Sequence, residues 1–434
     1  MNTETNLNIK DFIKRKQESK SHLDEEIQSF IKNLKSFTQD EITQWLKSVK
    51  LNGLNDKETS ALTLAMANSG TILNWEGLEP LIDKHSTGGI GDKITLFYAP
   101  LIAAYGINIP KLSGRSLGIT GGTIDKLESI PGFRTNLNIE EIKSQVKKIG
   151  LAIAGTSSNL APADKVLYSI RDVTNTVDSI PLIASSIMSK KIAGGATNII
   201  LDVKFGSGAF MKSLEDARLL ASTMVKIGNS LKRNTRAVIS DMNQPLGYSI
   251  GNALEIKEVI DVLSGKEVSD LIEVVISLAI ESIKIIEGKV ELSLEKKLLD
   301  LLLKGQALKK FEEMVLEQKG DLKTFCKSNK KTAFIETIKA ENEGYIQNID
   351  ARILGEEVHK LGAGRKLVSD SIDHSVGVVL FKKYGNKVNN HEPLLEIHAK
   401  NNKDAENAKN KLISAITIAH NTPPKLKLVQ EIIK

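Results

Sequence analysis

Residues 84–92 read KHSTGGIGD, and two further glycine-containing segments follow at 111–115 (KLSGR) and 120–128 (TGGTIDKLE). Glycine allows backbone N–H groups to turn toward a ligand where a side chain would block its approach, while Ser, Thr and Lys add hydroxyl donors and positive charge. The pattern therefore predicts two loops that bind one oxyanion, and phosphate is the obvious candidate.

The segments that flank these loops indicate where the loops lie. Ile94–Tyr105 (ITLFYAPLIAAY) has a helical spacing of apolar residues, and Ile107–Leu112 is typical of a short buried strand. Loops at the ends of adjacent strands converge on one crevice of an open α/β sheet. Glycine pairs can also simply mark turns. We favour a binding site because these loops also carry Lys, His, Ser, Arg and Thr.

A second polar group lies between residues 161 and 190. Tyr168, Arg171 and Asp172 fall on one face of a predicted helix, and Ser186 and Lys190 share a face of the next helix. An aromatic ring, a guanidinium, a hydroxyl and an ammonium suit a flat heterocycle with carbonyl oxygens. The alternative is that Tyr168 is a core residue and that Arg171 pairs with Asp164 or Asp172 on the helix surface.

Taken together, these segments resemble the pyrimidine and thymidine nucleoside phosphorylases over nearly the whole chain. The resemblance implies an α/β protein with a small all-α lobe, a large α/β lobe with a mixed sheet, and a C-terminal β-rich, barrel-like module. The segments that carry it are Asp83–Asp92, Ser113–Gly132, Ser158–Lys165, Arg171–Pro181, Asp202–Met211, Asp241–Glu258 and Leu361–Lys366.

The resemblance implies reversible phosphorolysis, in which a pyrimidine nucleoside (uridine, thymidine or deoxyuridine) and phosphate give the free base and α-D-ribose 1-phosphate or its 2-deoxy form. The implied catalytic residues are His85, Arg171 and Lys190. The implied phosphate contacts are Lys84, Ser86, Thr95, Ser113 and Thr123. The implied nucleoside contacts are His85, Lys111, Leu117, Tyr168, Arg171, Ser186 and Lys190.

The chemistry of this reaction agrees with the residue types. Breaking the C1′–N1 bond builds positive charge on the sugar and negative charge on the pyrimidine, so cationic donors are needed at the base and an anionic nucleophile on the other side. His85 is expected to donate a hydrogen bond and, because histidine titrates near neutral pH, a proton to the departing base. No organic cofactor is expected, and inorganic phosphate is the co-substrate.

The resemblance also implies a monovalent cation site, with K⁺ as the expected ion. In the pyrimidine branch of the family a small polar residue stands at position 93 and binds the ion through its carbonyl oxygen; here that residue is lysine. Most of the proposed ligands offer hard oxygen donors. They are Gly91, Lys93, Leu246, Ser249 and Glu258.

The subtype depends on Lys111 and on residues 244–248 (QPLGY), which look like the branch that accepts both uridine and thymidine. An ammonium can bond an extra sugar hydroxyl, whereas the apolar residue of the strict thymidine branch cannot. Ser116 and Ile119 depart from the family pattern and are interpreted as tolerated variation. Three alternatives stay open: a strict thymidine phosphorylase, a phosphoribosyltransferase of the same fold with its magnesium, and a non-catalytic binding protein.

Composition excludes several other classes. Lys and Arg number 59 and Asp and Glu 53, and the lysines are scattered, so nucleic-acid binding is not expected. The single Cys326 excludes an internal disulfide. The N-terminal segment lacks the apolar core of a signal peptide, and glutamates interrupt the apolar stretch 271–286. We therefore expect a cytoplasmic protein with no membrane contact.

The expected domains are an α lobe (1–70 and 163–193) for dimerisation and base binding, an α/β phosphate-binding lobe (71–162 and 194–339), and a β-rich module (340–434). Residues 38–41 (TQDE) predict a helix start. The family forms homodimers through the α lobe, and apolar positions within 23–46 are compatible with that assembly. Small residues at 154–156 and 194–195 are the expected hinges for closure of the two lobes.

Overall fold

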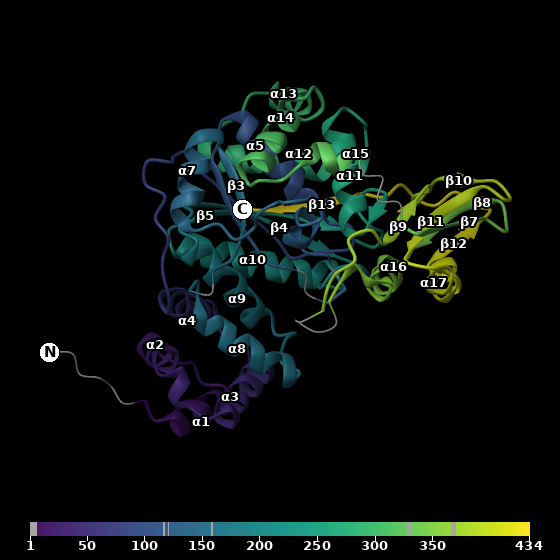
Figure 1. Cartoon of the computed structure of the whole chain (residues 1–434). Helices are drawn as coiled ribbons and strands as arrows, with labels where there is room; N and C mark the ends of the chain where they lie inside the picture. Colours follow the sequence, from purple (N-terminus) through teal and green to yellow (C-terminus); the bar gives the residue numbers. More distant parts are fainter. Residues whose placement is uncertain (1–6, 116–117, 120, 158, 328–331, 366–369) are drawn as a thin grey trace.

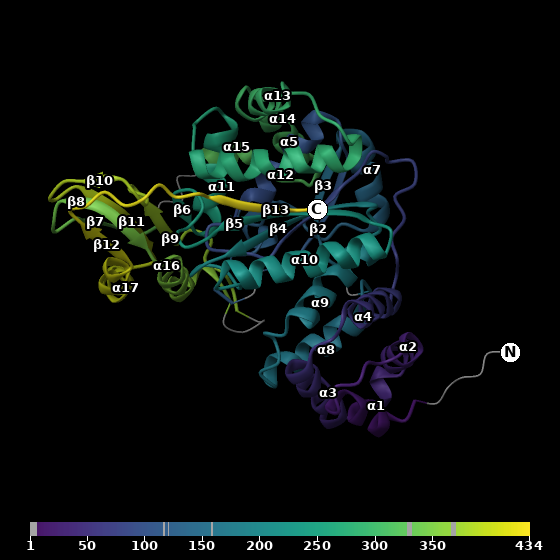
Figure 2. The same cartoon turned by 180° about the vertical axis from the view of Figure 1, so that it is seen from behind.

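The computed structural model describes residues 7–115, 118–119, 121–157, 159–327, 332–365 and 370–434. A helical lobe at the N-terminal end, a central α/β lobe and a β-rich module at the side of the central lobe are distinct in both views (Figures 1 and 2). The chain is therefore α/β overall, with the helical lobe and the module attached to different parts of the central lobe.

The helical lobe is built by amphipathic helices around an aromatic core. Phe12, Phe30 and Trp45 are almost fully buried, and their rings stack on one another. The capping box predicted at Thr38 is present, since its hydroxyl accepts from the N–H of Glu41. The elements are α1 (Ile9–Gln17), α2 (Asp24–Lys32), η1 (Leu34–Ser36), α3 (Gln39–Asn52), α4 (Asp56–Asn68), α8 (Pro162–Val173) and α9 (Ile180–Ala193).

A four-stranded mixed sheet with the order β1-β4-β5-β13 forms the centre of the α/β lobe. β1, β4 and β5 are parallel, and β13 joins the edge antiparallel to β5. In both views α10 lies on one face of this sheet and α12 on the other (Figures 1 and 2). The strands are β1 (Asp83–Ser86), β4 (Asn198–Phe205), β5 (Asn234–Asp241) and β13 (Val429–Ile433).

Helices cover this sheet on both sides, and α5, α13 and α14 pack together on the side of α12. The predicted helix Ile94–Tyr105 is confirmed at both ends, as α5. The helices of this lobe are α5, α6 (Thr123–Leu127), α7 (Ile139–Ile149), α10 (Leu214–Ser230), α11 (Asn252–Leu263), α12 (Ser269–Glu287), α13 (Leu294–Leu303), α14 (Gln306–Glu317) and α15 (Leu322–Lys327).

A separate pair of parallel strands, β2 (Ile109–Ser113) and β3 (Leu151–Gly155), lies beside the central sheet. The expected strand at 107–112 is thus present, shifted toward the second glycine loop. The first loop is shorter than residues 84–92 suggested, because Asp83–Ser86 pairs with β4 and is strand. Strand pairing therefore places His85 and Ser86 on a rigid element rather than in the loop.

The C-terminal module contains two antiparallel sheets, with the orders β10-β8-β12 and β6-β9-β11-β7. β6 (Ser249–Ile250) comes from the central lobe and pairs with β9, so the module shares a sheet with that lobe. The module does not extend to residue 434, because β13 returns to the central sheet. The remaining elements are β7 (Phe334–Lys339), β8 (Gly344–Ile349), α16 (Ala351–Val358), η2 (His359–Ala363), β9 (Gly377–Leu380), β10 (Lys387–Val388), β11 (Pro393–Ala399), α17 (Asn402–Ser414) and β12 (Ile416–Ala419).

The chain passes from α9 into the central lobe at a closely packed crossing. The N–H of Leu73 donates to the carbonyl of Ala193 at 2.8 Å, and the Trp75 indole donates to Gly194 at 2.6 Å. A Cβ on Gly195, whose φ is +79°, would lie 2.0 Å from the carbonyl oxygen of Leu73. Only glycine fits there. Among the helices that the structure describes, none has the length and apolar character needed to cross a membrane.

Candidate active site

A cavity of about 490 Å³ lies between the helical lobe and the central lobe. Its walls come from the ends of β1 and β2, from the two glycine loops and from helices α8 and α9. Lys84 is buried behind the wall, and Leu117 and Ser116 lie outside the described residues. The predicted residues that line the cavity are His85, Ser86, Thr95, Lys111, Ser113, Thr123, Tyr168, Arg171, Ser186 and Lys190.

The first glycine loop is held by Ser86 and Asp92. The Ser86 hydroxyl donates to the Asp92 carboxylate at 2.5 Å and accepts from the N–H of Gly88 at 3.1 Å. Burial opposes ionisation of Asp92, but the Lys84 and Lys204 ammoniums hold the pKa of this carboxyl well below its usual range. Asp92 also accepts from the N–H of Ile94 at the start of α5. The charged carboxylate of Asp92 therefore connects the first glycine loop to the start of α5.

Lys84 supplies positive charge from behind the cavity wall. Its Nζ lies 2.9 Å from a carboxylate oxygen of Asp202 and donates to the Thr95 hydroxyl at 3.2 Å. The Lys204 Nζ lies 2.5 Å from the other oxygen of the same carboxylate. The two ammoniums thus face two carboxylates, Asp202 and Asp92, and Lys84 is the one whose ammonium contacts Thr95.

Asp202 and Lys204 were not among the predicted site residues. A signal for them exists in the sequence, since residues 198–205 read NIILDVKF and place two charged residues in an otherwise apolar run. That run is the buried strand β4, where charged side chains are rare unless they are paired. Their partner Lys84 is too distant in sequence for the pairing to be foreseen.

A similar arrangement surrounds Lys111. Asp83 lies 2.6 Å from the Lys191 Nζ and 3.9 Å from the Lys111 Nζ, and Lys111 also donates to the carbonyl of Leu112. Burial, with repulsion from Lys191, lowers the pKa of Lys111 to about 7. At neutral pH the ammonium and the neutral amine of Lys111 are therefore both populated.

His85 lies in the cavity wall close to these ammoniums. Burial, together with repulsion from Lys191, Lys111 and Lys190, holds the pKa of His85 well below its usual value. The imidazole is therefore neutral at pH 7 before ligands bind. This differs from the expectation of a histidine that titrates near neutral pH, because Lys111, Lys190 and Lys191 come close to His85 only in the folded chain. A neutral imidazole still donates one hydrogen bond.

On the helical side of the cavity, Arg171 is buried rather than exposed on the surface of α8. Its guanidinium donates to the carbonyls of Thr176, Val177 and Leu182 at 3.3, 2.9 and 3.1 Å. It also lies 5.9 Å from the centre of the Tyr168 ring. The turn after α8 therefore fixes the guanidinium at the cavity wall, and N–H groups remain for a ligand because arginine has five.

Lys190 and Ser186 meet on one face of α9, as their spacing predicted. The Lys190 Nζ donates to the Ser186 hydroxyl at 3.2 Å and lies 2.5 Å from the carboxylate of Asp164 on α8. Asp164, one of the two aspartates considered as partners for Arg171, thus binds Lys190 instead. Asp164 joins α8 to α9 and orients the ammonium within the cavity wall.

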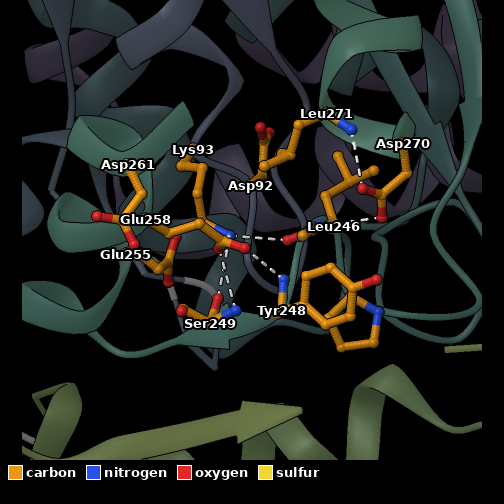
Figure 3. A network of polar contacts seen from close by, with 12 residues as sticks. Asp92, Lys93, Leu246, Tyr248, Ser249, Glu255, Glu258, Asp261, Asp270 and Leu271 are labelled. Carbon is orange, nitrogen blue, oxygen red and sulfur yellow. Dashed lines mark hydrogen bonds and ion pairs between the residues drawn. The ribbon is translucent and has the colours of Figure 1, made fainter. Parts of the chain in front are cut away.

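The five residues expected around a monovalent cation do come together, at the far side of the first loop (Figure 3). The Lys93 Nζ donates to the carbonyls of Leu246 and Ser249 at 2.7 and 3.0 Å, and it lies 2.8 Å from Glu258. The Lys93 carbonyl, the expected ligand atom, accepts from the N–H of Leu96. The residues present therefore do not fit a bound K⁺, because an ammonium lies among the expected oxygen ligands.

The polar groups of the cavity suit anions better than metal ions. Within the ranges that the structure covers, no three His, Cys, Asp or Glu side chains are grouped so that they could hold a metal ion. The cavity presents cations, hydroxyls and backbone N–H groups, which are suited to anions and carbonyl oxygens. The carboxylates of Asp83 and Asp92 in its wall are bound by Lys191 and by the Ser86 hydroxyl.

Two known sequence families match the chain. Residues 78–308 match the glycosyl transferase family, a/b domain, and residues 345–419 match the pyrimidine nucleoside phosphorylase C-terminal domain. In overall fold the chain is similar to anthranilate phosphoribosyltransferase from Thermus thermophilus, with a TM-score of 0.56 and 17% identity, covering 71% of this chain and 99% of that one.

Full-length relatives are much closer in sequence. Pyrimidine-nucleoside phosphorylase of Staphylococcus haemolyticus (strain JCSC1435) is 46% identical over 437 residues, which cover 98% of this chain and 100% of the relative. The protein of the same name from Staphylococcus aureus (strain N315) is 45% identical, covering 97% and 99%. With this identity over almost all of its length, the chain belongs to the pyrimidine-nucleoside phosphorylase family, within the glycosyl transferases.

Proposed function

We propose that the chain catalyses the reversible phosphorolysis of uridine, thymidine and deoxyuridine to the free base and (2-deoxy-)α-D-ribose 1-phosphate. The observation that supports this most is a single cavity with anion-binding loops on one wall and the cations Arg171 and Lys190 on the other. Its volume of about 490 Å³ suits a small molecule. Phosphate and base can therefore lie on opposite sides of the sugar.

The phosphate side consists mainly of hydroxyl groups supported by charge from behind. Ser86, Thr95, Ser113 and Thr123 line that wall, and the Thr95 hydroxyl accepts from the Lys84 ammonium. This bond leaves the Thr95 hydroxyl hydrogen free to be donated to a phosphate oxygen. Lys84 thus favours a dianion both by its charge and by orienting Thr95.

The base side stabilises the leaving group. A phosphate oxygen forms a bond to C1′ as the C1′–N1 bond breaks and its electron pair moves to N1. Arg171 and Lys190 bind the base carbonyl oxygens, where that negative charge accumulates. His85 donates a hydrogen bond from its neutral ring, and attack from the opposite wall converts the β-nucleoside into the α-sugar phosphate.

In this proposal, the acceptance of both ribose and 2-deoxyribose nucleosides depends on Lys111. Its ammonium group lies at the cavity and is held by Asp83 and the Leu112 carbonyl. It can bond a ribose 2′-hydroxyl, which supports acceptance of uridine over a strict thymidine phosphorylase. A phosphoribosyltransferase activity would require Mg²⁺, and among the described residues no three His, Cys, Asp or Glu side chains are grouped so that they could hold a metal ion.

We also propose a cytoplasmic homodimer that contacts neither nucleic acid nor membrane. In a single copy, Leu23 and Leu51 of the helical lobe leave 53% and 83% of their surface exposed. An interface between two copies through this lobe would bury such apolar surface. Cys326 is an exposed free thiol, which suits a reducing compartment. Light scattering after size-exclusion chromatography measures the assembly, and a monomer at micromolar concentration would contradict it.

The activity is tested by incubating the protein with uridine or thymidine, with and without inorganic phosphate, and following release of the free base by chromatography. Base release that requires phosphate, together with sugar 1-phosphate, supports the proposal. Release without phosphate would indicate a hydrolase. Release of base only from the nucleoside 5′-monophosphate, with pyrophosphate and Mg²⁺, would indicate a phosphoribosyltransferase, because the 5′-phosphate is part of its sugar product. Lys190→Met, which keeps the length of the side chain but removes its charge, is the matched inactive control.

A further inference from the structure

The side chain of Lys93 is enclosed in the protein at a junction of three segments. It follows Asp92 of the first glycine loop, precedes α5, and points toward the turn 246–249 and α11 (Figure 3). None of its side-chain surface is exposed, and Glu258 is 5% exposed. A lysine without contact to water needs a partner for each polar hydrogen.

Each hydrogen of the ammonium has such a partner. The Lys93 Nζ faces the Leu246 carbonyl at 2.7 Å, the Ser249 carbonyl at 3.0 Å and the Glu258 carboxylate at 2.8 Å. An ammonium has three N–H donors, and the site provides three oxygen acceptors. Two carbonyls and a carboxylate are also the kind of oxygen donors that hard metal cations prefer. The three oxygens thus bind one cation, and in this protein that cation is the ammonium group of Lys93.

Glu258 is oriented independently of the lysine. Its two carboxylate oxygens accept from the backbone N–H groups of Tyr248 and Ser249 at 2.7 and 3.0 Å. The carboxylate therefore remains in place whether the neighbouring cation is an ammonium or a metal ion.

The neighbouring carboxylates already have cationic partners. Asp270 lies 2.9 Å from the Lys383 Nζ, and Glu255 lies 3.1 Å from the Lys126 Nζ. Lys93 and Glu258 balance each other in the same way. A metal ion added at these oxygens would place an uncompensated positive charge next to a buried ammonium, at high energetic cost.

We propose that the Lys93 ammonium permanently takes the place of a monovalent metal cation, so that the protein needs no K⁺ for stability or for activity. The ammonium joins the loop that contains Asp92 to the turn 246–249. That turn continues into β6, which pairs with β9 of the C-terminal module. The lysine thereby positions the first glycine loop relative to the module. The proposal concerns an ion requirement and does not depend on which nucleoside is the substrate.

The first test uses the unmodified protein. Its melting temperature and its kcat/KM for phosphate are measured in KCl and in choline chloride of equal ionic strength, after exhaustive removal of K⁺ and ammonium ions. We expect the melting temperatures to agree within about 1 °C and kcat/KM to be unchanged. A fall of several degrees, or a severalfold loss of kcat/KM, in choline chloride would overturn the proposal.

The second test removes the ammonium. Lys93→Ser opens the space and leaves the oxygens, whereas the matched control Lys93→Met fills the space without charge. In choline chloride we expect both variants to melt about 5 °C or more below the parent. Saturating KCl should restore most of that loss in Lys93→Ser and none of it in Lys93→Met. If KCl restores neither, or both equally, these oxygens are not a cation site and the proposal fails.

Discussion

Lys84→Met tests whether the buried charge behind Thr95 binds phosphate. Methionine keeps the approximate length and volume of the side chain, so the packing around a fully buried position changes little. The substitution removes the bond of 3.2 Å to the Thr95 hydroxyl and one of the two ammoniums that face Asp202 and Asp92. We expect phosphate binding to weaken strongly, while nucleoside binding stays close to that of the parent.

The size of the effect follows from the geometry. A phosphate oxygen bonded to Thr95 would lie about 5 Å from the Lys84 Nζ, and at an effective dielectric of about 20 that distance contributes ~3 kcal/mol per unit charge. Since every 1.4 kcal/mol is tenfold, kcat/KM for phosphate should fall by roughly a hundredfold or more. The carboxylates Asp202 and Asp92 do not cancel this effect, because they and Lys204 are present in both the parent and the variant, so the difference in phosphate binding measures the Lys84 ammonium alone.

Lys204→Met is the matched control. It also leaves Asp202 with one ammonium partner, but Lys204 donates to Ser240 rather than to Thr95. Steady-state kinetics over a range of phosphate concentrations, with titration calorimetry for phosphate and nucleoside, separates the two variants. Equal losses of phosphate affinity in both would show that only the summed charge matters and not its place behind Thr95. An unchanged affinity in Lys84→Met would refute the electrostatic reasoning altogether.

Four further predictions concern Lys111, His85, Glu58 and the closure of the two lobes. Lys111→Met should lower kcat/KM for uridine roughly tenfold more than for thymidine, because only ribose has a 2′-hydroxyl to lose its donor; equal losses would assign Lys111 to phosphate or loop structure. In NMR titrations of the ligand-free protein, the His85 ring should stay neutral through the usual titration range of histidine, because burial and nearby lysines lower its pKa. Glu58→Gln should lower the free energy of unfolding by about 3–5 kcal/mol, because it leaves the buried Lys16 ammonium unpaired. Although burial opposes ionisation, Lys16 lowers the pKa of Glu58, so this stability is present above pH 4.5 and is lost as the pH falls through the folded pKa; thermal melts of parent and variant should therefore converge in acid. Phosphate with a pyrimidine base should make the particle more compact in small-angle scattering, because the cavity lies between two lobes; identical profiles would contradict closure.

The local features of this protein could be read from the sequence because each depends on neighbouring residues. The helix Ile94–Tyr105 follows from apolar spacing, and the capping box at Thr38 follows from residues three positions apart. The contact between Ser186 and Lys190 follows from one helical turn. The loops around the cavity were indicated in the same way by glycines near hydroxyl and charged residues, and the mixed sheet was implied by the family resemblance.

The partners of the charged side chains required the tertiary structure. The sequence offered Asp164 as a neighbour of Arg171, but packing of α8 against α9 brings it to Lys190. Strand pairing, which no local pattern specifies, places Lys84 beside Asp202 and brings β13 back from the C-terminal module to β5.

Lys93 shows the same limit most clearly. The family resemblance counted it among five expected ligands of a cation, in place of a small polar residue that binds the ion through its carbonyl oxygen. Whether its ammonium would turn to solvent or inward depended on the Leu246 and Ser249 carbonyls, 153 and 156 residues away. Backbone propensities act over a few residues, whereas buried charges find partners only where the folded chain excludes water. Sequence therefore determined the elements and the composition of the site, and tertiary packing decided which charges meet.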